Sequence, residues 1–214
     1  MLNTYWKHFK SGTDIRGVAI DGVAGEPLDL TDEAVRRMAA GFAVWLSARA
    51  GKPAAALTVS VGRDSRISGP RLRDAVTAAL TAAGVTVLDC GLASTPAMFM
   101  TTVDLGCDGA VQLTASHHPY HRNGLKFFLP SGGLEGSDIE AVLQNAQDGI
   151  APPAASGCCR SVEYMTQYAA RLRRLICDGV KAADYDHPLA GFHIVVDAGN
   201  GAGGFYASDV LAPL

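Results

Sequence analysis

The apolar and polar positions of this chain switch repeatedly between a helical and an extended period. Apolar residues recur every three or four positions from Thr31 to Gly51, which predicts a helix capped at Thr31 and ended by Gly51. The β-rich run Leu57–Val61 predicts a strand, and the segment Ser68–Gly84 returns to the helical period. The first predicted elements are therefore a helix, a strand and a second helix.

The same alternation continues to about residue 146. The pair Asn123-Gly124 is typical of a turn, and the spacing Ser137-x-x-Glu140 matches a capping box at the start of a helix. Thr95-Pro96 predicts the start of another short helix. The remaining predicted strands are 85–88, 110–113 and 125–129. Strands that alternate with helices predict an α/β fold, with a mixed, mostly parallel sheet and helices on both of its faces.

A change in composition separates a second predicted region from the first. Residues 149–157 are rich in Pro, Ala and Gly and have no periodicity, so we place a boundary between a domain over 1–150 and the beginning of another over 160–214. The later region has a helical pattern over 162–176, a strand pattern over 193–196 and a glycine-rich turn over 199–204. Because parallel strands need crossover partners, we expect this second domain to be a similar α/β unit that is incomplete.

Composition and charge narrow the possible partners. The formal net charge is −3, and nucleic acids and anionic membranes require a basic surface, so neither is an expected partner. No apolar run reaches the roughly 18 residues of a membrane span, and no signal-peptide core is present near residue 1. The five cysteines lack the spacing of a zinc site. We therefore expect reduced thiols and a cytoplasmic protein.

The densest group of reactive side chains is TASHHPYHRNGLKFF, residues 114–128. Ser116 offers a hydroxyl nucleophile, and three of the six histidines lie within residues 117–121. Arg122 and Lys126 add positive charge. The segment directly follows a predicted buried strand, and ligands of open α/β sheets bind at the carboxyl ends of strands. This loop is the predicted centre of the chemistry.

Two further polar loops contain arginines, TDIRG at 13–17 and GRDSR at 62–66. A guanidinium group suits phosphate because its planar fork can donate to two oxygens at once. The alternative for each arginine is an ion pair inside the domain, with Asp14 or Asp64 as the partner. Both interpretations remain open at this point.

Five segments in this order resemble the alpha-D-phosphohexomutase family, which includes phosphomannomutase and phosphoglucomutase. They are SGTDIRG (11–17), VGRDSR (61–66), TASHHP (114–119), NGLKF (123–127) and VDAGNGAGG (196–204). The resemblance spans nearly the whole chain, and the serine loop with its downstream Gly-x-Lys is the most specific part. It implies the first domain of that family and the start of the second.

The resemblance also implies a mechanism in which hexose 1-phosphate and 6-phosphate interconvert through a phosphoserine and a bisphosphate intermediate. Ser116 matches the serine that carries the phosphoryl group, and Lys126 matches the general acid or base. His117 matches the histidine beside the serine, and Arg16 matches an arginine that lines the active site. The implied substrate-binding residues are Arg63, Arg66 and Asn123.

The chain departs from the family pattern in two ways. Ser116-His117-His118-Pro119 stands where the family has Ser-His-Asn-Pro. The family also binds Mg²⁺ through an Asp-Gly-Asp-Gly-Asp-Arg loop that this sequence lacks, which leaves Ser116 as the one implied ligand here. We therefore expect an N-terminal portion of a mutase, with little turnover by itself.

Three other interpretations are weighed against this one. The spacing Gly199-x-Gly-x-x-Gly204 matches a dinucleotide fingerprint, although the expected acidic residue about 20 positions later lies beyond residue 214. A serine hydrolase would use Ser116 with a histidine, but the Gly-x-Ser-x-Gly motif is missing. The third alternative is a non-catalytic fragment that binds a phosphosugar.

Overall fold

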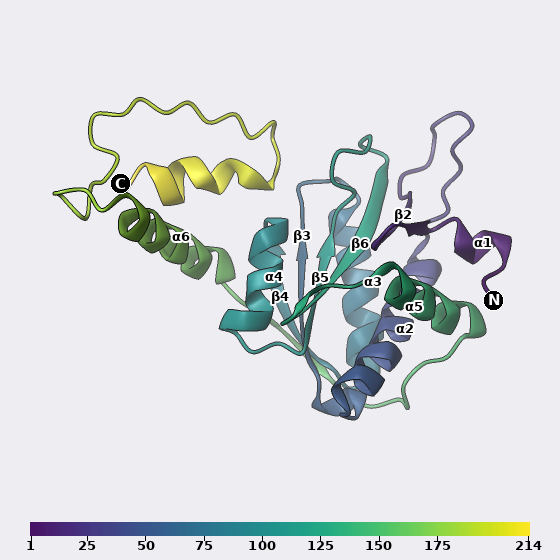
Figure 1. The fold of residues 1–214 in the computed structure, drawn as a ribbon. Helices are drawn as coiled ribbons and strands as arrows, with labels where there is room; N and C mark the ends of the chain where they lie inside the picture. The colour runs from purple at the N-terminus through teal and green to yellow at the C-terminus, as the bar shows by residue number, and fades with distance from the viewer.

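An eight-stranded sheet runs through the centre of the molecule, and helices lie on both sides of it (Figure 1). The computed structural model describes residues 1–214. The strand order is β1-β2-β6-β5-β3-β4-β8, and β7 pairs with β6. The strands are β1 (Lys10–Ser11), β2 (Asp14–Val18), β3 (Thr58–Arg63), β4 (Thr86–Leu92), β5 (Gly109–Leu113), β6 (Arg122–Leu129), β7 (Gly132–Gly133) and β8 (Cys158–Ser161).

The sheet combines a parallel part with an antiparallel part. Strand β3 pairs in parallel with β4 and β5, and β4 pairs in parallel with β8. Strand β6 runs antiparallel to β5 on one side and to β2 on the other. The expected α/β class with a mixed sheet is confirmed, and its parallel part contains the strands β3, β4 and β5 that helices connect.

The helices divide between the two faces of the sheet. They are α1 (Thr4–Lys7), α2 (Asp32–Ala50), α3 (Gly69–Ala82), α4 (Thr95–Asp104), α5 (Gly136–Asp148) and α6 (Tyr164–Val180). Helices α2, α3 and α5 pack together over one face, whereas α4 and α6 contact each other on the opposite side. Shorter helical turns are η1 (Ala54–Ala56), η2 (Ala202–Gly204) and η3 (Tyr206–Leu211). None of these helices combines the length and apolar character that a membrane crossing requires.

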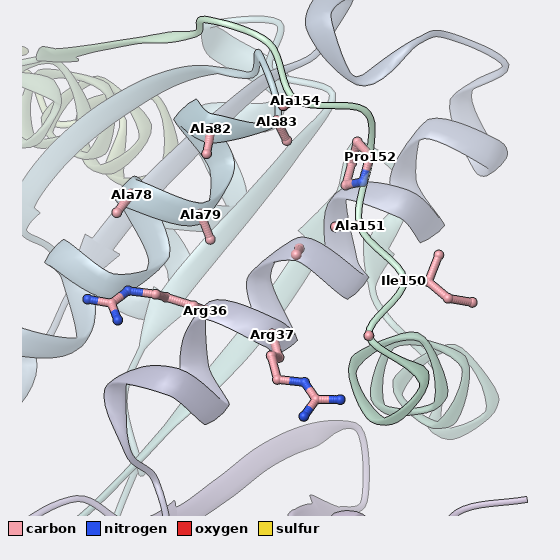
Figure 2. Close-up of a pocket in the computed structure, with 12 residues that line it drawn as sticks. Arg36, Arg37, Ala78, Ala79, Ala82, Ala83, Ile150, Ala151, Pro152 and Ala154 are labelled. Atoms are coloured by element: carbon pink, nitrogen blue, oxygen red, sulfur yellow. The ribbon is translucent and has the colours of Figure 1, made fainter.

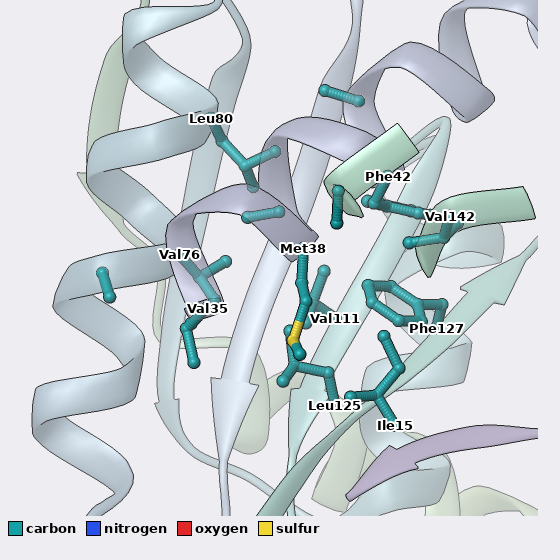
Figure 3. Close-up of a cluster of buried hydrophobic side chains, with 14 of the residues drawn as sticks. Ile15, Val35, Met38, Phe42, Val76, Leu80, Val111, Leu125, Phe127 and Val142 are labelled. Atoms are coloured by element: carbon teal, nitrogen blue, oxygen red, sulfur yellow. The ribbon is translucent and has the colours of Figure 1, made fainter. Parts of the chain in front are cut away.

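The larger hydrophobic core lies between the sheet and helices α2, α3 and α5 (Figure 3). Phe42 of α2 stacks on Phe127 of β6, with ring centroids 4.5 Å apart. Ile15 of β2 and Leu125 of β6 are fully buried in the same core and pair with each other across the strands. Because strand side chains alternate between faces, burying these residues turns their neighbours Asp14 and Lys126 to the other side.

The structure confirms both predicted ends of α2 and corrects the predicted start of α5. The Thr31 side chain accepts the Ala34 N–H at the start of α2, and Gly51 ends that helix at φ 64°. The Ser137-x-x-Glu140 capping box is wrong, because α5 begins at Gly136 and its capping box is formed by Glu135 and Asp138. A charged side chain one residue before the helix therefore replaces the predicted serine.

Two other predictions are corrected by strand pairing. Asn123 and Gly124 do not form a turn but lie inside β6, where they pair with Gly17 and Arg16 of β2. The strand predicted over residues 193–196 is absent, because no neighbouring strand pairs with it. Strand β8 was not predicted; it pairs with β4 and extends the sheet past residue 150.

Residues beyond β8 leave the sheet along α6, as Figure 1 shows. The Tyr164 hydroxyl at the start of α6 donates to Asp104 at the end of α4, over 2.8 Å. The π-helical segment η3 packs back against α6. Several large apolar residues of the segment between them are exposed, including Phe192 at 73% and Val195 at 82%.

The five cysteines are all unpaired, and they differ strongly in burial. Burial raises the pKa of Cys90 to about 12 and that of Cys107 to about 11. The thiolate is the reactive form, so these two thiols are protonated at neutral pH as well as inaccessible. Cys158, on the edge strand β8, is exposed.

We therefore expect iodoacetamide at about pH 8 to modify Cys158 well before Cys90 and Cys107. Peptide mass spectrometry after short incubation measures the order of modification. All five cysteines should react together once guanidinium chloride has unfolded the chain. Equal rates for Cys90 and Cys158 in the folded protein would contradict the burial described here.

Candidate active site

Ser116 lies at the exposed tip of the loop that follows β5, with a backbone φ of 56°. Positive φ is uncommon for a residue with a side chain and stores local strain, which the surrounding structure has to stabilise. The Thr114 hydroxyl accepts the Ser116 N–H at 2.9 Å and donates to Asp64 at 2.7 Å. A chain of two hydrogen bonds thus links the strained residue to the β3 loop.

His117 and His118 lie near Ser116, and neither forms a short hydrogen bond with it. The Ser116 Oγ lies 3.4 Å from the His117 Nδ1, which is long for a hydrogen bond. The rings of His117 and His118 stack with centroids 5.1 Å apart. Burial lowers the pKa of His118, and the Arg16 guanidinium lowers it further. His118 is therefore held toward its neutral form, so its ring keeps a lone pair.

The Asp14 carboxylate forms ion pairs with Lys126 and Arg16, the two cationic side chains expected near Ser116. The Lys126 Nζ contacts both Asp14 carboxylate oxygens, at 2.7 and 2.6 Å, and the Arg16 Nη2 donates to the same carboxylate at 2.9 Å. Arg16 Nη1 also donates to the Ala115 carbonyl at 3.3 Å. Adjacent strands β2 and β6 bring these side chains together, since Ile15 pairs with Leu125. Positive charge therefore lies next to the backbone of the serine loop.

The Arg66 guanidinium donates hydrogen bonds to the backbone of the serine loop and to Asp64. Its Nε donates to Asp64 at 3.2 Å, and its Nη1 donates to the carbonyls of Pro119 and Arg122 at 2.7 and 2.9 Å. Its Nη2 donates to the carbonyls of Ser116 and His118 at 3.0 and 2.7 Å. The guanidinium has five N–H groups, so no donor is left for the substrate contact expected from the sequence.

The other two residues expected to contact substrate are Asn123 and Arg63, and they differ from Arg66 in their hydrogen bonds. Asn123 is fully buried; it donates to the Ser68 hydroxyl at 2.9 Å and accepts the Gly124 N–H at 2.8 Å. Arg63 makes one hydrogen bond, to the Asp64 carbonyl at 3.3 Å. Of these residues, Arg63 keeps most of its donors free.

A cavity of about 590 Å³ opens beside Ser116, within the size range of small-molecule sites. Three separate segments line it: the β3 loop, the serine loop and the glycine-rich turn near the C-terminal end. The lining residues are Asp64, Ser65, Arg66, Ile67, Thr114, Ser116, His118, Tyr120, Gly199, Asn200, Gly201 and Ala202. Residues more than 80 positions apart thus meet around the nucleophile.

Comparison with known proteins shows the family to which this chain belongs. Residues 10–151 match the family model for phosphoglucomutase/phosphomannomutase, alpha/beta/alpha domain I. The chain belongs to the phosphoglucomutase/phosphomannomutase family. The match covers the sheet strands β1 to β7 and the whole serine loop.

Named relatives agree with this assignment. A phosphoglucosamine mutase of Rhodococcus erythropolis is 39% identical over 91% of this chain and 42% of its own length. Another from Lacticaseibacillus casei is 36% identical over 73% of this chain and 34% of its own length. The solved structure of a phosphoglucomutase/phosphomannomutase family protein from Burkholderia thailandensis has a TM-score of 0.64 and 29% identity over 80% of this chain and 36% of that one. This chain thus spans less than half the length of these relatives.

A second cavity of this family member differs in chemistry from the first. It has a volume of about 390 Å³ and lies between α2, α3 and residues 149–154, where alanine side chains dominate the lining (Figure 2). Arg37 on its border donates to the Ala146 and Gln147 carbonyls at the end of α5. No hydroxyl or histidine lines this cavity, so the cavity beside Ser116 is the candidate active site of the family member.

The Mg²⁺ implied by the family resemblance finds no binding site among these residues. No group of three His, Cys, Asp or Glu side chains comes close enough to hold a metal ion. The carboxylates of Asp14 and Asp64 are both paired with cationic side chains. Ser116 alone would leave an octahedral ion underfilled, so we assign no step to magnesium.

The glycine-rich turn also lacks the surroundings of a dinucleotide site. That fingerprint requires a strand before the glycines and a helix opened by them, whereas residues 193–196 form no strand here. The turn has positive φ at Gly199 and Asn200, and it faces the Ser116 cavity. In this family member the glycines therefore shape one wall of the candidate site.

Four acidic or hydroxyl residues of the site were not among the predicted functional residues: Asp14, Glu26, Asp64 and Thr114. Glu26 accepts from the Arg122 Nε at 2.8 Å and lies 3.3 Å from the His121 Nε2. The hydrogen bond from Arg122 lowers the pKa of Glu26, with a smaller contribution from His121. The motifs TDIRG and GRDSR contain two of the four, but their pairing depends on tertiary contacts.

Proposed function

We propose that this chain is the serine-bearing part of a phosphohexomutase, which interconverts hexose 1-phosphate and hexose 6-phosphate. The observation that carries the proposal is the position of Ser116. Ser116 is exposed at a strained turn on the border of a cavity. Arg16 donates a hydrogen bond to the carbonyl of the preceding residue, Ala115. Catalysis of phosphoryl transfer depends on positioning and charge stabilisation, and both are supported by this arrangement.

The proposed reaction has two transfers. In the first, a sugar hydroxyl oxygen attacks the phosphorus of phosphorylated Ser116, the bond from phosphorus to the serine Oγ breaks, the sugar hydroxyl gives its proton to a base, and the serine Oγ takes up a proton. The sugar bisphosphate then reorients. In the second, the Ser116 Oγ gives up its proton and attacks the phosphorus of the other phosphate, the bond from that phosphorus to its sugar oxygen breaks, and the sugar oxygen takes up a proton. We propose Lys126 for the proton transfers, with Asp14 holding its Nζ in place, and His117 and Arg16 beside the transferred group.

The substrate is proposed to be a hexose phosphate, and relatives guide which one to test first. Two of the three relatives named above are called phosphoglucosamine mutases, so glucosamine phosphate is the first candidate. Arg63 is the proposed contact to substrate phosphate, because most of its N–H groups have no protein acceptor.

The experiment follows phosphate on Ser116. Incubation with a hexose 1,6-bisphosphate is expected to add one phosphate to the 214-residue chain, and peptide fragmentation should place it on Ser116. Ser116→Ala should take up none, because the acceptor oxygen is removed. Adding hexose monophosphate should then remove the phosphate from the wild-type chain.

The second candidate function is a non-catalytic module that binds phosphosugars. It is favoured by the small number of free donors at the site, since all five donors of Arg66 are paired within the protein and Asn123 is fully buried. Binding of hexose phosphate without any phosphate on Ser116 would support this module. In that outcome the proposal of a phosphoryl-carrying serine is rejected.

A further inference from the structure

The contacts of Arg66 define a role that differs from substrate binding. Its side chain borders the cavity beside Ser116 but is only 12% exposed. Four of its five N–H groups end on backbone carbonyls of residues 116–122. The fifth reaches Asp64. A group with every donor paired inside the protein gains nothing by turning toward a ligand.

The loop depends on these hydrogen bonds because it has little regular structure. Backbone carbonyls that face inward must find donors, and a loop without a neighbouring strand cannot supply them. The guanidinium presents its donors in one rigid plane, so it fixes several carbonyls relative to each other. Arg66 therefore supplies the hydrogen-bond donors that a neighbouring strand would otherwise provide to the carbonyls of the segment that contains Ser116.

The Asp64 carboxylate links the Arg66 guanidinium to the N–H of Ser116 through the Thr114 hydroxyl. This carboxylate accepts from the Arg66 Nε and also from the Thr114 hydroxyl, which in turn accepts the Ser116 N–H. The Ser116 carbonyl is held by Arg66 and its N–H by Thr114. Both peptide groups around the φ of 56° are thus fixed through the pair Asp64–Arg66.

We propose that Arg66 is a positioning residue, which sets the conformation of Ser116 for phosphoryl transfer without contacting the substrate. The proposal rests on the function proposed above and changes one part of it. The arginine of the GRDSR motif acts on the serine backbone, and recognition of substrate phosphate falls to other cations. A displacement of about 1 Å at a reacting atom can slow a reaction about 100-fold, which sets the scale of the expected effect.

The test compares Arg66→Lys with the wild-type chain. Lysine keeps the charge but has three donors on one atom, so it cannot hold four carbonyls and Asp64 together. We expect the saturating rate of Ser116 phosphorylation by glucose 1,6-bisphosphate to fall about 100-fold. The half-saturating concentration should stay within about threefold, because no substrate contact is lost. Asp64→Asn weakens the acceptor of the Arg66 Nε and of the Thr114 hydroxyl, and it should also lower the rate of Ser116 phosphorylation, by a smaller factor.

A measurement that needs no substrate accompanies the kinetics. Amide hydrogen exchange of residues 115–122 should become faster in Arg66→Lys, while exchange in β3 and β5 stays the same. Arg36→Lys is the matched control, since Arg36 is exposed on α2 and makes no ion pair or side-chain hydrogen bond in the structure. It should leave both the phosphorylation and the exchange unchanged.

The outcomes separate this inference from the proposed function. A raised half-saturating concentration with an unchanged saturating rate would make Arg66 a substrate contact and overturn the inference. An unchanged rate together with unchanged loop exchange would overturn it as well. If the wild-type chain takes up no phosphate, the proposed function fails, and loop exchange in Arg66→Lys alone decides whether Arg66 holds the loop.

Discussion

Replacing Lys126 with arginine is expected to slow phosphoryl exchange at Ser116 by about 10²- to 10⁴-fold, the usual contribution of a general acid or base. Arginine keeps the positive charge that faces the Asp14 carboxylate, so the ion pair and the fold should survive. Its guanidinium does not give up a proton in proteins, so it cannot relay one to or from a sugar hydroxyl. The loss of rate therefore isolates proton transfer from charge.

Exchange of labelled phosphate between hexose monophosphate and Ser116 measures this effect. Lys10→Arg is the control, because Lys10 also forms an ion pair with a carboxylate, that of Glu140, but lies outside the site. Both variants should show the thermal unfolding of the wild-type chain. A Lys126→Arg variant with wild-type exchange would remove Lys126 from the proton transfers and leave it as a purely electrostatic residue.

Replacing Gly124 with alanine is expected to destabilise the fold by about 2 to 3 kcal/mol, at the upper end of the usual cost of overpacking. A Cβ at this position would collide with the Ile15 carbonyl oxygen and lie 3.0 Å from the Thr114 carbonyl oxygen. Both are backbone atoms of neighbouring strand and loop, so they cannot rotate away as a side chain would. The strands β2 and β6 would have to separate next to the pair Asp14–Lys126.

Urea unfolding gives the change in free energy from the shift in midpoint at constant slope. Gly133→Ala in β7 is the matched control, since the nearest atom to its Cβ would be 3.9 Å away. We expect that control to change stability by less than about 0.5 kcal/mol. Equal effects of the two substitutions would show that β2 and β6 tolerate a wider spacing than the structure has.

Local sequence patterns predicted most elements of the fold because burial acts on them in a regular period. The helix after Thr31 and the strand ending near Leu113 were found in this way. The patterns failed where a partner distant in sequence decides the outcome. Asn123-Gly124 has the composition of a turn, yet pairing with β2 makes it strand, and the apolar run at 193–196 stays unpaired for lack of a neighbour.

The sequence predicted the residue types of the candidate site better than the hydrogen bonds and ion pairs that connect them. The sequence placed Ser116 after a buried strand and cations near it, and those positions follow from strand alternation. It could not distinguish an arginine that binds phosphate from one that binds the chain itself. In the structure, Arg66 donates to four backbone carbonyl groups, and their positions depend on tertiary contacts that the sequence does not show.

The left-handed backbone at position 116 also restricts which residue could fill the proposed role of phosphoryl carrier. Threonine has the same hydroxyl, but its branched Cβ makes a positive φ much more costly than it is for serine. Glycine would adopt the conformation freely and has no oxygen to modify. Of the two aliphatic hydroxyl side chains, the turn at position 116 thus favours serine over threonine, so the backbone as well as the chemistry limits which residue can serve as the proposed nucleophile.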